Sequence, residues 1–183
     1  MLTEADSNMD LAALVRTIPD FPKPGILFRD VSTLLLDGRG FRTAIDRLIA
    51  TFDPDAVDLI AGVEARGFIV ASALSYALSK GKIMLRKSGK LPGAAVGIDY
   101  ALEYGTDRIE MHVGAVMPGT RVLLVDDPIA TGGTALAGVQ LLRSEGAVVG
   151  EARFLVDLPE LGGATRLREA GVACTALLSF PGH

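Results

Sequence analysis

Short apolar runs alternate along the chain with longer segments in which apolar residues recur every three or four positions. The runs at residues 57–63, 82–86 and 121–126 are brief and are bounded by turn-forming or charged residues, which is typical of buried strands. Residues 67–79 and 134–144 have helical spacing. This alternation predicts an α/β fold, in which a central and mostly parallel sheet is flanked by helices.

Further turns and strands extend this pattern. Gly81 and Gly146 follow the two helical segments and are predicted to end them. Residues 148–156 predict another strand and residues 174–180 an edge strand. In sheets of this kind ligands bind beyond the carboxyl ends of the strands, so we expect the functional residues there.

Two segments interrupt the alternation. Residues 18–25 hold three prolines and one glycine, which exclude a continuous helix and give the chain a stiff, turned path. Residues 87–105 hold four glycines and one proline. Because connections of this length are usually disordered or functional, we expect a mobile loop at about 87–105. The first eight residues are expected to be a frayed end.

Composition and charge narrow the class of protein. The 183 residues suit one domain, and 49% of them are hydrophobic, which is enough for a substantial core. Neither a membrane helix nor a signal peptide is apparent, so we expect a cytoplasmic protein. The net charge of −4 argues against nucleic acid as a partner, and the single Cys174 excludes an intrachain disulfide. With only His112 and His183, a multi-histidine metal site is not expected.

The strongest functional signal is the sequence at residues 122–134, VLLVDDPIATGGT. An apolar strand delivers Asp126 and Asp127 to its carboxyl end, and a loop of small residues then opens a helix. The backbone amides of this loop and the amino end of the helix form a cradle for an anion, and Gly132 and Gly133 allow close approach of the backbone. Each half alone has a structural alternative, since a Gly-Gly pair often makes a tight turn and an Asp often caps a helix.

The two halves together indicate a sugar phosphate. A phosphate suits the cradle, whereas the carboxylates repel an anion and need a polyol or a cation. A ribose 5-phosphate has vicinal hydroxyls beside a monophosphate and matches both. Other phosphate motifs are missing: neither Gly-Lys pair, at 81–82 and 89–90, is followed by Ser or Thr, and no GxGxxG occurs.

Residues 125–134 resemble the phosphoribosyl-pyrophosphate (PRPP) binding motif of the type I phosphoribosyltransferases. Four segments resemble, in the same order, the signature blocks of the adenine-specific branch of that family: FPKPGILFRD at 21–30, EARGF at 64–68, RKSGKLP at 86–92 and LEYG at 102–105. The resemblance spans about residues 18–180. It implies the type I phosphoribosyltransferase fold as a single domain, 1–183, with a small N-terminal hood of about residues 1–35 that contributes the base pocket, and with a flexible catalytic loop.

The resemblance also implies a reaction. The 5-phosphoribosyl group of PRPP is transferred to adenine, which gives AMP and pyrophosphate in purine salvage. Mg²⁺ is the implied cofactor, and the implied partners are PRPP, adenine and a second copy of the chain in a homodimer.

The site residues carried over from the family form several groups. The ribose hydroxyls are assigned to Asp126 and Asp127, with Asp126 also as a metal ligand, directly or through water. The 5-phosphate is assigned to Ala130, Thr131, Gly132, Gly133 and Thr134. The pyrophosphate is assigned to Arg66, Arg86, Lys87 and Lys90, and adenine to Leu27, Phe28 and Arg29. The implied catalytic residues are Glu103, Arg66 and Tyr104, with Glu103 as the acid or base near the purine N7.

Several of these residues also have a plainer interpretation. Each basic residue taken singly suits a solvated surface, Glu103 an exposed loop and Phe28 a core position. Arg29 and Asp30 suit a structural pair. The chain departs from the family pattern at Pro128-Ile129, where two leucines are typical, and in the residues at 93–97, which are rich in glycine and alanine.

Two other functions stay open from the sequence. A phosphoribosyltransferase for another base keeps the chemistry and changes the pocket, and the block at 21–30 argues against it. A non-catalytic PRPP or purine sensor is expected to carry an added basic DNA-binding domain, for which the chain has neither the length nor the charge.

Overall fold

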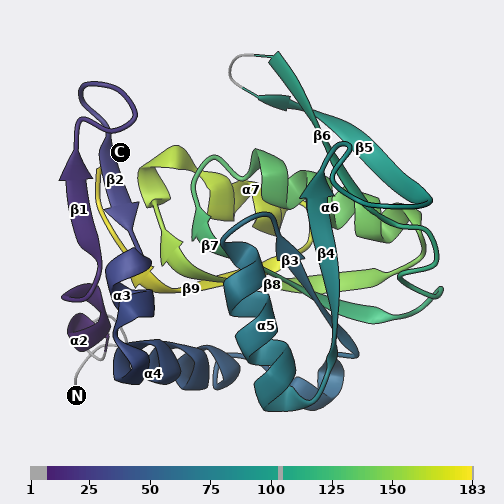
Figure 1. The fold of residues 1–183 in the computed structure, drawn as a ribbon, viewed down its shortest axis with the longest axis horizontal. Coiled ribbons are helices and arrows are strands. Elements are labelled where there is room, and N and C mark those ends of the chain that lie inside the picture. Colours follow the sequence, from purple (N-terminus) through teal and green to yellow (C-terminus); the bar gives the residue numbers. More distant parts are fainter. Residues whose placement is uncertain (1–7, 103–104, 183) are drawn as a thin grey trace.

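A seven-stranded sheet forms the centre of the protein in this computed structural model, which describes residues 8–102 and 105–182 (Figure 1). Its strand order is β5-β6-β4-β3-β7-β8-β9. The strands are β3 (Leu59–Val63), β4 (Gly81–Lys87), β5 (Ala95–Leu102), β6 (Gly105–His112), β7 (Arg121–Ile129), β8 (Val148–Asp157) and β9 (Ala173–Ser179). β4, β3, β7, β8 and β9 are parallel, and β5 and β6 are joined antiparallel at the β4 edge. The predicted mostly parallel sheet is confirmed.

Helices cover both faces of this sheet. The helices α4 (Gly38–Ile49) and α5 (Gly67–Leu78) bury their apolar residues on one face, and α6 (Gly133–Ser144) and α7 (Gly163–Glu169) bury theirs on the other. Successive side chains of a strand point to opposite faces, so β7 contributes to both cores: Leu123 packs with α4 and α5, and Leu124 packs with α6. Among the helices of the described residues, none has the length and apolar character to cross a membrane.

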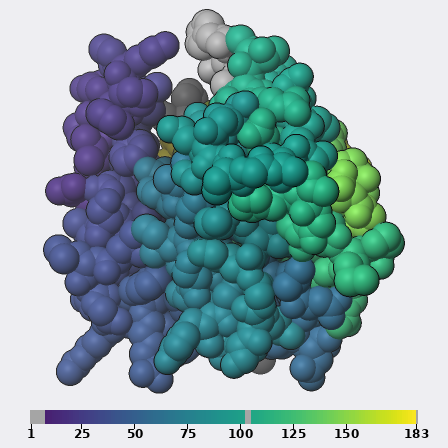
Figure 2. Space-filling view, turned by 45° about the vertical axis from the view of Figure 1, so that its right-hand side comes forward, coloured from purple at the N-terminus to yellow at the C-terminus, as the bar shows by residue number. Residues whose placement is uncertain are grey.

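The N-terminal segment forms a separate layer beside the sheet. It consists of α2 (Met9–Ala12), β1 (Arg16–Pro19), β2 (Leu27–Asp30) and α3 (Ser32–Leu36). β1 and β2 pair antiparallel as a two-stranded sheet. Asp30 fixes the start of α3, because it accepts a hydrogen bond from the Ser32 amide at 2.9 Å and pairs with Arg16 at 2.5 Å. Figure 2 shows the surface hollowed between this purple segment and the teal strands β5 and β6.

The structure corrects two predictions about local structure. The helix α5 ends at Leu78, and the residue that stops it is Ser79, which adopts the left-handed conformation with φ +53°; Gly81, two residues later, begins β4 instead. The predicted loop at 87–105 contains an eight-residue strand, β5, which pairs with β6 from Ala95↔His112 to Leu102↔Gly105. Gly146 lies just after α6 with φ +92°, and β9 is an edge strand, as predicted.

Candidate active site

The two adjacent acids lie inside β7 rather than in the loop that follows it, toward the carboxyl end of the sheet. The Asp127 amide donates a hydrogen bond to Asp126 Oδ1 at 2.9 Å, and Asp127 is only 3% exposed. Burial raises the pKa of both carboxyl groups above the ordinary 3.8, and the negative charge of Asp127 raises the pKa of Asp126 further. The protein only partly compensates the negative charge of this pair. A ligand that donates hydrogen bonds to the two carboxylates would therefore stabilise their ionised form.

The loop after β7 leads into the amino end of α6. Gly132 has φ +80°, a conformation that side chains other than hydrogen rarely allow. The helix starts at Gly133, and the Leu136 amide donates to Gly132 O at 2.8 Å. The amides that precede Leu136 in the first turn have no intrahelical acceptor, as at any helix start. They and the positive end of the helix dipole form the predicted anion cradle.

Two residues that sequence reasoning missed support this cradle from α7. Gly163 donates its amide to Ala130 O at 2.9 Å, and Arg166 Nη1 donates to Thr131 O at 2.9 Å. A Cβ on Gly163 would lie 2.3 Å from Ala130 O, so only glycine fits there. The Gly-Gly pair at 162–163 is visible in the sequence and indicates a tight turn or a close backbone contact. Nothing in the local sequence shows that its partner is the phosphate loop about thirty residues earlier.

Arg66 occupies a position between the acids and the N-terminal layer. It follows β3 and forms an ion pair with Asp127 Oδ2. Its guanidinium also lies over the ring of Phe28, 5.3 Å from the ring centroid, within the range of a cation–π contact. Arg66 therefore connects the residues predicted for the ribose to the residue predicted for the purine.

The basic residues at the end of β4 are also paired with carboxylates. Arg86 pairs with Glu64 at 3.0 Å, and Lys87 pairs with Asp107 of β6 at 3.2 Å. Glu64 additionally accepts a hydrogen bond from the Lys87 amide at 3.0 Å. The side chain of Lys90 is exposed, and its carbonyl accepts from Arg86 Nη1 at 2.9 Å. The structure thus brings three of the four predicted pyrophosphate residues, Arg66, Arg86 and Lys87, to one edge of the sheet.

A cavity of about 170 Å³ lies where these groups meet. Its polar lining includes Glu64, Lys87, Tyr100, Asp107, Asp126 and Thr134. These residues come from the ends of β3, β4 and β7, from the start of α6 and from β5 and β6. The predicted convergence of strand ends is therefore observed. Tyr100 lies on a strand in the segment predicted as a loop, Asp107 lies on the next strand, and neither was predicted as a site residue.

The residues predicted for the base lie on β2. Leu27 and Phe28 are half-buried, and Phe28 meets Phe21 edge-on, with ring centroids 5.2 Å apart. Phe28 is not part of either buried core, which disfavours the core interpretation. The Arg29 side chain points elsewhere: it donates to Thr17 Oγ1 at 2.6 Å and to Pro181 O at 2.7 Å.

Arg29 and Asp30 do not form the structural pair that the sequence suggested. Asp30 pairs with Arg16, and hydrogen bonds from Ser32 together with Arg16 lower the pKa of Asp30 to about 2. Arg29 instead ties β2 to the C-terminal segment, where its guanidinium lies 4.9 Å from the centroid of the Phe180 ring. Both residues are structural, with different partners.

Two predicted catalytic residues, Glu103 and Tyr104, lie outside the described residues. Cys174 is buried, and burial raises the pKa of its thiol to about 11, so the thiol is protonated at neutral pH and packs as a small core residue.

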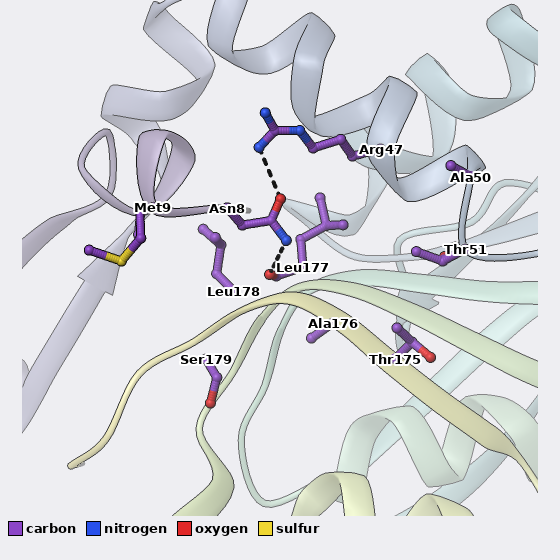
Figure 3. A pocket seen from close by; sticks show the side chains of 11 residues that line it. Asn8, Met9, Arg47, Ala50, Thr51, Thr175, Ala176, Leu177, Leu178 and Ser179 are labelled. Carbon is purple, nitrogen blue, oxygen red and sulfur yellow. Dashed lines mark hydrogen bonds between the residues drawn. The ribbon is translucent and has the colours of Figure 1, made fainter. Parts of the chain in front are cut away.

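A larger cavity of about 570 Å³ lies at the outer edge of β9, away from the predicted residues (Figure 3). It is lined mainly by α2, α4 and β9. Asn8 lines it and bridges α4 and β9: it accepts a hydrogen bond from Arg47 and donates to Leu177 O, both at 2.9 Å. None of the side chains predicted to bind PRPP or adenine lines this cavity.

Comparison with known proteins agrees with this geometry. Residues 33–160 match the family model described as the phosphoribosyl transferase domain. A relative from Rhodopseudomonas palustris (strain BisB18), named adenine phosphoribosyltransferase, is 57% identical over 95% of this chain and 87% of its own length.

Solved structures give the same result. Adenine phosphoribosyltransferase from Thermoanaerobacter pseudethanolicus superposes with a TM-score of 0.89 at 41% identity, covering 94% of this chain and 99% of that one. The Saccharomyces cerevisiae enzyme, solved with an imino-altritol bisphosphate and adenine, superposes with a TM-score of 0.87 at 34% identity, covering 93% of this chain and 97% of that one.

The chain belongs to the phosphoribosyltransferase family and has its type I fold. It is an enzyme that transfers a phosphoribosyl group. Within the family it belongs with the adenine phosphoribosyltransferases, because relatives at this identity cover nearly its full length.

Proposed function

We propose that the site at the carboxyl end of β7 binds PRPP and adenine and converts them to AMP and pyrophosphate. The observation that carries the proposal is the placement of the buried acid pair between the helix-end cradle of α6 and the basic ends of β3 and β4. PRPP has the same arrangement: its ribose hydroxyls lie between the phosphate on C5 and the diphosphate on C1. The hydroxyls match the acid pair, the 5-phosphate matches the helix-end cradle, and the diphosphate matches the basic strand ends.

Each part of PRPP then has a partner of the right chemistry. The hydroxyls of the ribose donate to Asp126 and Asp127, and charge-assisted hydrogen bonds of this kind are worth about 1.5–3 kcal/mol each. The 5-phosphate accepts from the loop amides at residues 130–134 and from the hydroxyls of Thr131 and Thr134. The diphosphate faces Arg66, Arg86, Lys87 and Lys90.

Adenine is placed against the ring of Phe28. Stacking on an aromatic ring is worth about 1–3 kcal/mol per base. The backbone of β2 around Leu27 and Arg29 supplies fixed donors and acceptors, since β2 pairs only with β1 among the described strands and its other edge has no strand partner there. A main-chain edge that matches a 6-amino group leaves a 6-oxo purine with unpaired polar atoms, and this mismatch selects adenine.

Mg²⁺ fits the acid pair. The pair is largely buried, Arg66 offsets the charge of Asp127, and carboxylate oxygens are the hard donors that Mg²⁺ prefers. Asp126 and Asp127 would hold the ion, directly or through water. When bound, the ion supplies positive charge that offsets the charge of the diphosphate.

The reaction breaks the bond between ribose C1 and the diphosphate oxygen, and the electron pair leaves with pyrophosphate. Adenine N9 forms the new bond to C1 with inversion, and the purine loses one proton. Glu103, which the resemblance assigns as acid or base near N7, is proposed to handle that proton. The β5–β6 hairpin contributes Tyr100, Asp107 and Ile109 to the cavity lining and is proposed to exclude water, which would otherwise capture the ribosyl centre.

The test of this function is turnover of single bases. The protein is incubated with PRPP and Mg²⁺ and with adenine, guanine or hypoxanthine in turn, and nucleotide formation is measured by chromatography. We expect AMP from adenine and little product from the 6-oxo purines. Turnover of guanine or hypoxanthine without adenine would overturn the base assignment, and no turnover with any base would overturn the reaction.

The raised pKa of the acid pair predicts how PRPP use depends on pH. The ribose and the metal bind the ionised carboxylates, so kcat/KM for PRPP is expected to fall as the pH drops through the raised pKa, earlier than for a carboxyl with the ordinary pKa of 3.8. The profile is measured from pH 5 to 8 with saturating adenine. Because the phosphates of PRPP also titrate, the same profile is recorded for Asp126→Asn, which should lose the contribution of Asp126 to the decline.

A homodimer and a cytoplasmic location stay predictions. The exposed apolar residues Ile69 and Tyr76 share one side of α5, and Met84 is exposed on the neighbouring strand β4. We propose this face as the contact with the second copy. Sedimentation should show a dimer, and a Tyr76→Glu variant should shift it toward the monomer, whereas a monomeric parent protein would contradict the proposal.

A further inference from the structure

Three of the four cations assigned to the diphosphate, Arg66, Arg86 and Lys87, share one property: each is paired with a carboxylate of the chain itself. Arg66 pairs with Asp127, and Arg86 pairs with Glu64, both partners being parts of the motifs that resemble the family. The third carboxylate, Asp107, belongs to none of the matched segments. It comes from β6, the strand that joins the hairpin to the β4 edge (Figure 1).

Asp107 is held firmly in its position. Its Oδ1 accepts the amide of Arg108 at 2.8 Å, and its Oδ2 contacts Lys87 Nζ at 3.2 Å and accepts from the Tyr100 hydroxyl at 3.3 Å. The hydrogen bond from the Arg108 amide, together with Lys87, lowers the pKa of Asp107, so it is an anion at neutral pH. Lys87 responds in the opposite sense, because Asp107 raises its pKa.

Tyr100 connects this ion pair to the phosphate loop. Its hydroxyl donates to Asp107 and lies 3.4 Å from Thr134 Oγ1, which donates to it. Thr134 has one hydroxyl hydrogen and cannot donate it to Tyr100 and to a 5-phosphate at the same time. A line of contacts therefore runs from the residue proposed for the 5-phosphate, through Tyr100 and Asp107, to a residue proposed for the diphosphate.

We propose that Asp107 is a positioning residue that competes with the diphosphate group for Lys87. It fixes the ammonium group beside the cavity and offsets its charge. Diphosphate must overcome this pairing when it binds, and Asp107 pairs with Lys87 again when pyrophosphate leaves. This inference rests on the proposed function, because it takes pyrophosphate as the leaving group. It gives the β5–β6 hairpin a role in product release besides that of a cover.

The sign of the effect separates this role from a structural one. Loss of a supporting contact usually weakens ligand binding, whereas loss of a competing anion strengthens it. Asp107→Asn keeps the size of the side chain and its acceptor for the Arg108 amide and removes the charge. We expect it to bind Mg²⁺-pyrophosphate about threefold to tenfold more tightly than the parent protein, measured by isothermal titration calorimetry, and to show a lower KM for PRPP.

Three further variants make the result specific. Asp99→Asn removes the same charge from the same hairpin, where Asp99 is exposed and pairs with Arg108 outside the cavity lining, and it should leave the affinity unchanged. Asp107→Glu keeps the charge and should keep the affinity near that of the parent. In a Lys87→Gln background, Asp107→Asn should lose most of its effect, because the two residues act through one contact.

Equal or weaker pyrophosphate binding by Asp107→Asn would overturn the inference, as would an undiminished effect without Lys87. If Asp107→Asn does not fold, Asp107→Ser is measured in its place with the same expected sign. Failure of the proposed function has a different signature, since the parent protein would then show no adenine turnover and no pyrophosphate binding at all.

Discussion

In the double variant Asp126→Asn/Asp127→Asn, we expect kcat/KM for PRPP to fall about 10²- to 10⁴-fold. We expect its melting temperature to stay the same or to rise. Two charge-assisted hydrogen bonds to the ribose, each worth about 1.5–3 kcal/mol, account for the loss. Steady-state kinetics with adenine held at saturation and a thermal melt of the same sample measure the two quantities.

Stability moves the other way because the pair is costly to the fold. Burial raises the pKa of both carboxyl groups, so the stability that their protonated forms contribute is present below the unfolded pKa and is lost as the pH rises through the raised pKa. At neutral pH the ionised pair therefore destabilises the native state, and Asn relieves this. Residues kept at a cost to stability are typical of binding sites.

A matched control should show the reverse pattern. Asp58 lies at the opposite end of the sheet and accepts hydrogen bonds from the Arg121 side chain and amide, which lower its pKa to about 2. Asp58→Asn should lower the melting temperature and leave kcat/KM unchanged. If the double variant kept its PRPP kinetics, or lost activity only in proportion to a lower melting temperature, the ribose role of the acid pair would be wrong.

The second large effect is expected from Gly132→Ala in the phosphate loop. Gly132 has φ +80°, and a Cβ there would lie 2.9 Å from the Cα and 3.0 Å from the carbonyl oxygen of Gly163. Both obstacles are backbone, so the loop itself must shift. We expect a loss of about 2–4 kcal/mol in the free energy of unfolding, from conformational strain and overpacking together, and a KM for PRPP raised at least tenfold.

The variant Gly162→Ala separates the effect of backbone strain from the effect of steric overlap with Gly163. Gly162 has a similar φ of +74°, but a Cβ there has no heavy atom within 4 Å. This variant should lose only about 1 kcal/mol, from the backbone conformation alone, and keep its KM for PRPP. Chemical denaturation and PRPP titration of the two variants give the comparison. Equal effects would show that contact between the phosphate loop and α7 contributes nothing.

The parts of the fold predicted from the sequence are those that depend on local pattern. The strands β3, β4, β7 and β8 were each found within a few residues of the predicted ranges, because a buried parallel strand is an uninterrupted apolar run. The stop of α5 was misplaced because a serine adopted the left-handed conformation that usually favours glycine. β5 was missed although Val96, Ile98 and Tyr100 alternate toward the core, because the glycines and the proline around them favoured a loop.

The candidate site divides in the same way. The acid pair, the glycine loop and the helix start are contiguous in the chain, so the sequence alone shows that they are neighbours in space. The partners of the basic residues are not contiguous: Lys87 meets Asp107 and Arg66 meets Asp127 across neighbouring strands. No spacing rule relates such pairs, because sheet order and hairpin pairing bring them together.

The sequence by itself determined the chemical groups of this protein and the strand ends on which they lie, since both follow from residue type and local backbone preference. Only the tertiary structure decided which charges neutralise one another, that α7 supports the phosphate loop through Gly163 and Arg166, and that a hairpin adds Asp107 and Tyr100 to the cavity. The physical reason is that burial and ion pairing depend on distances between segments far apart in the chain, which packing alone sets.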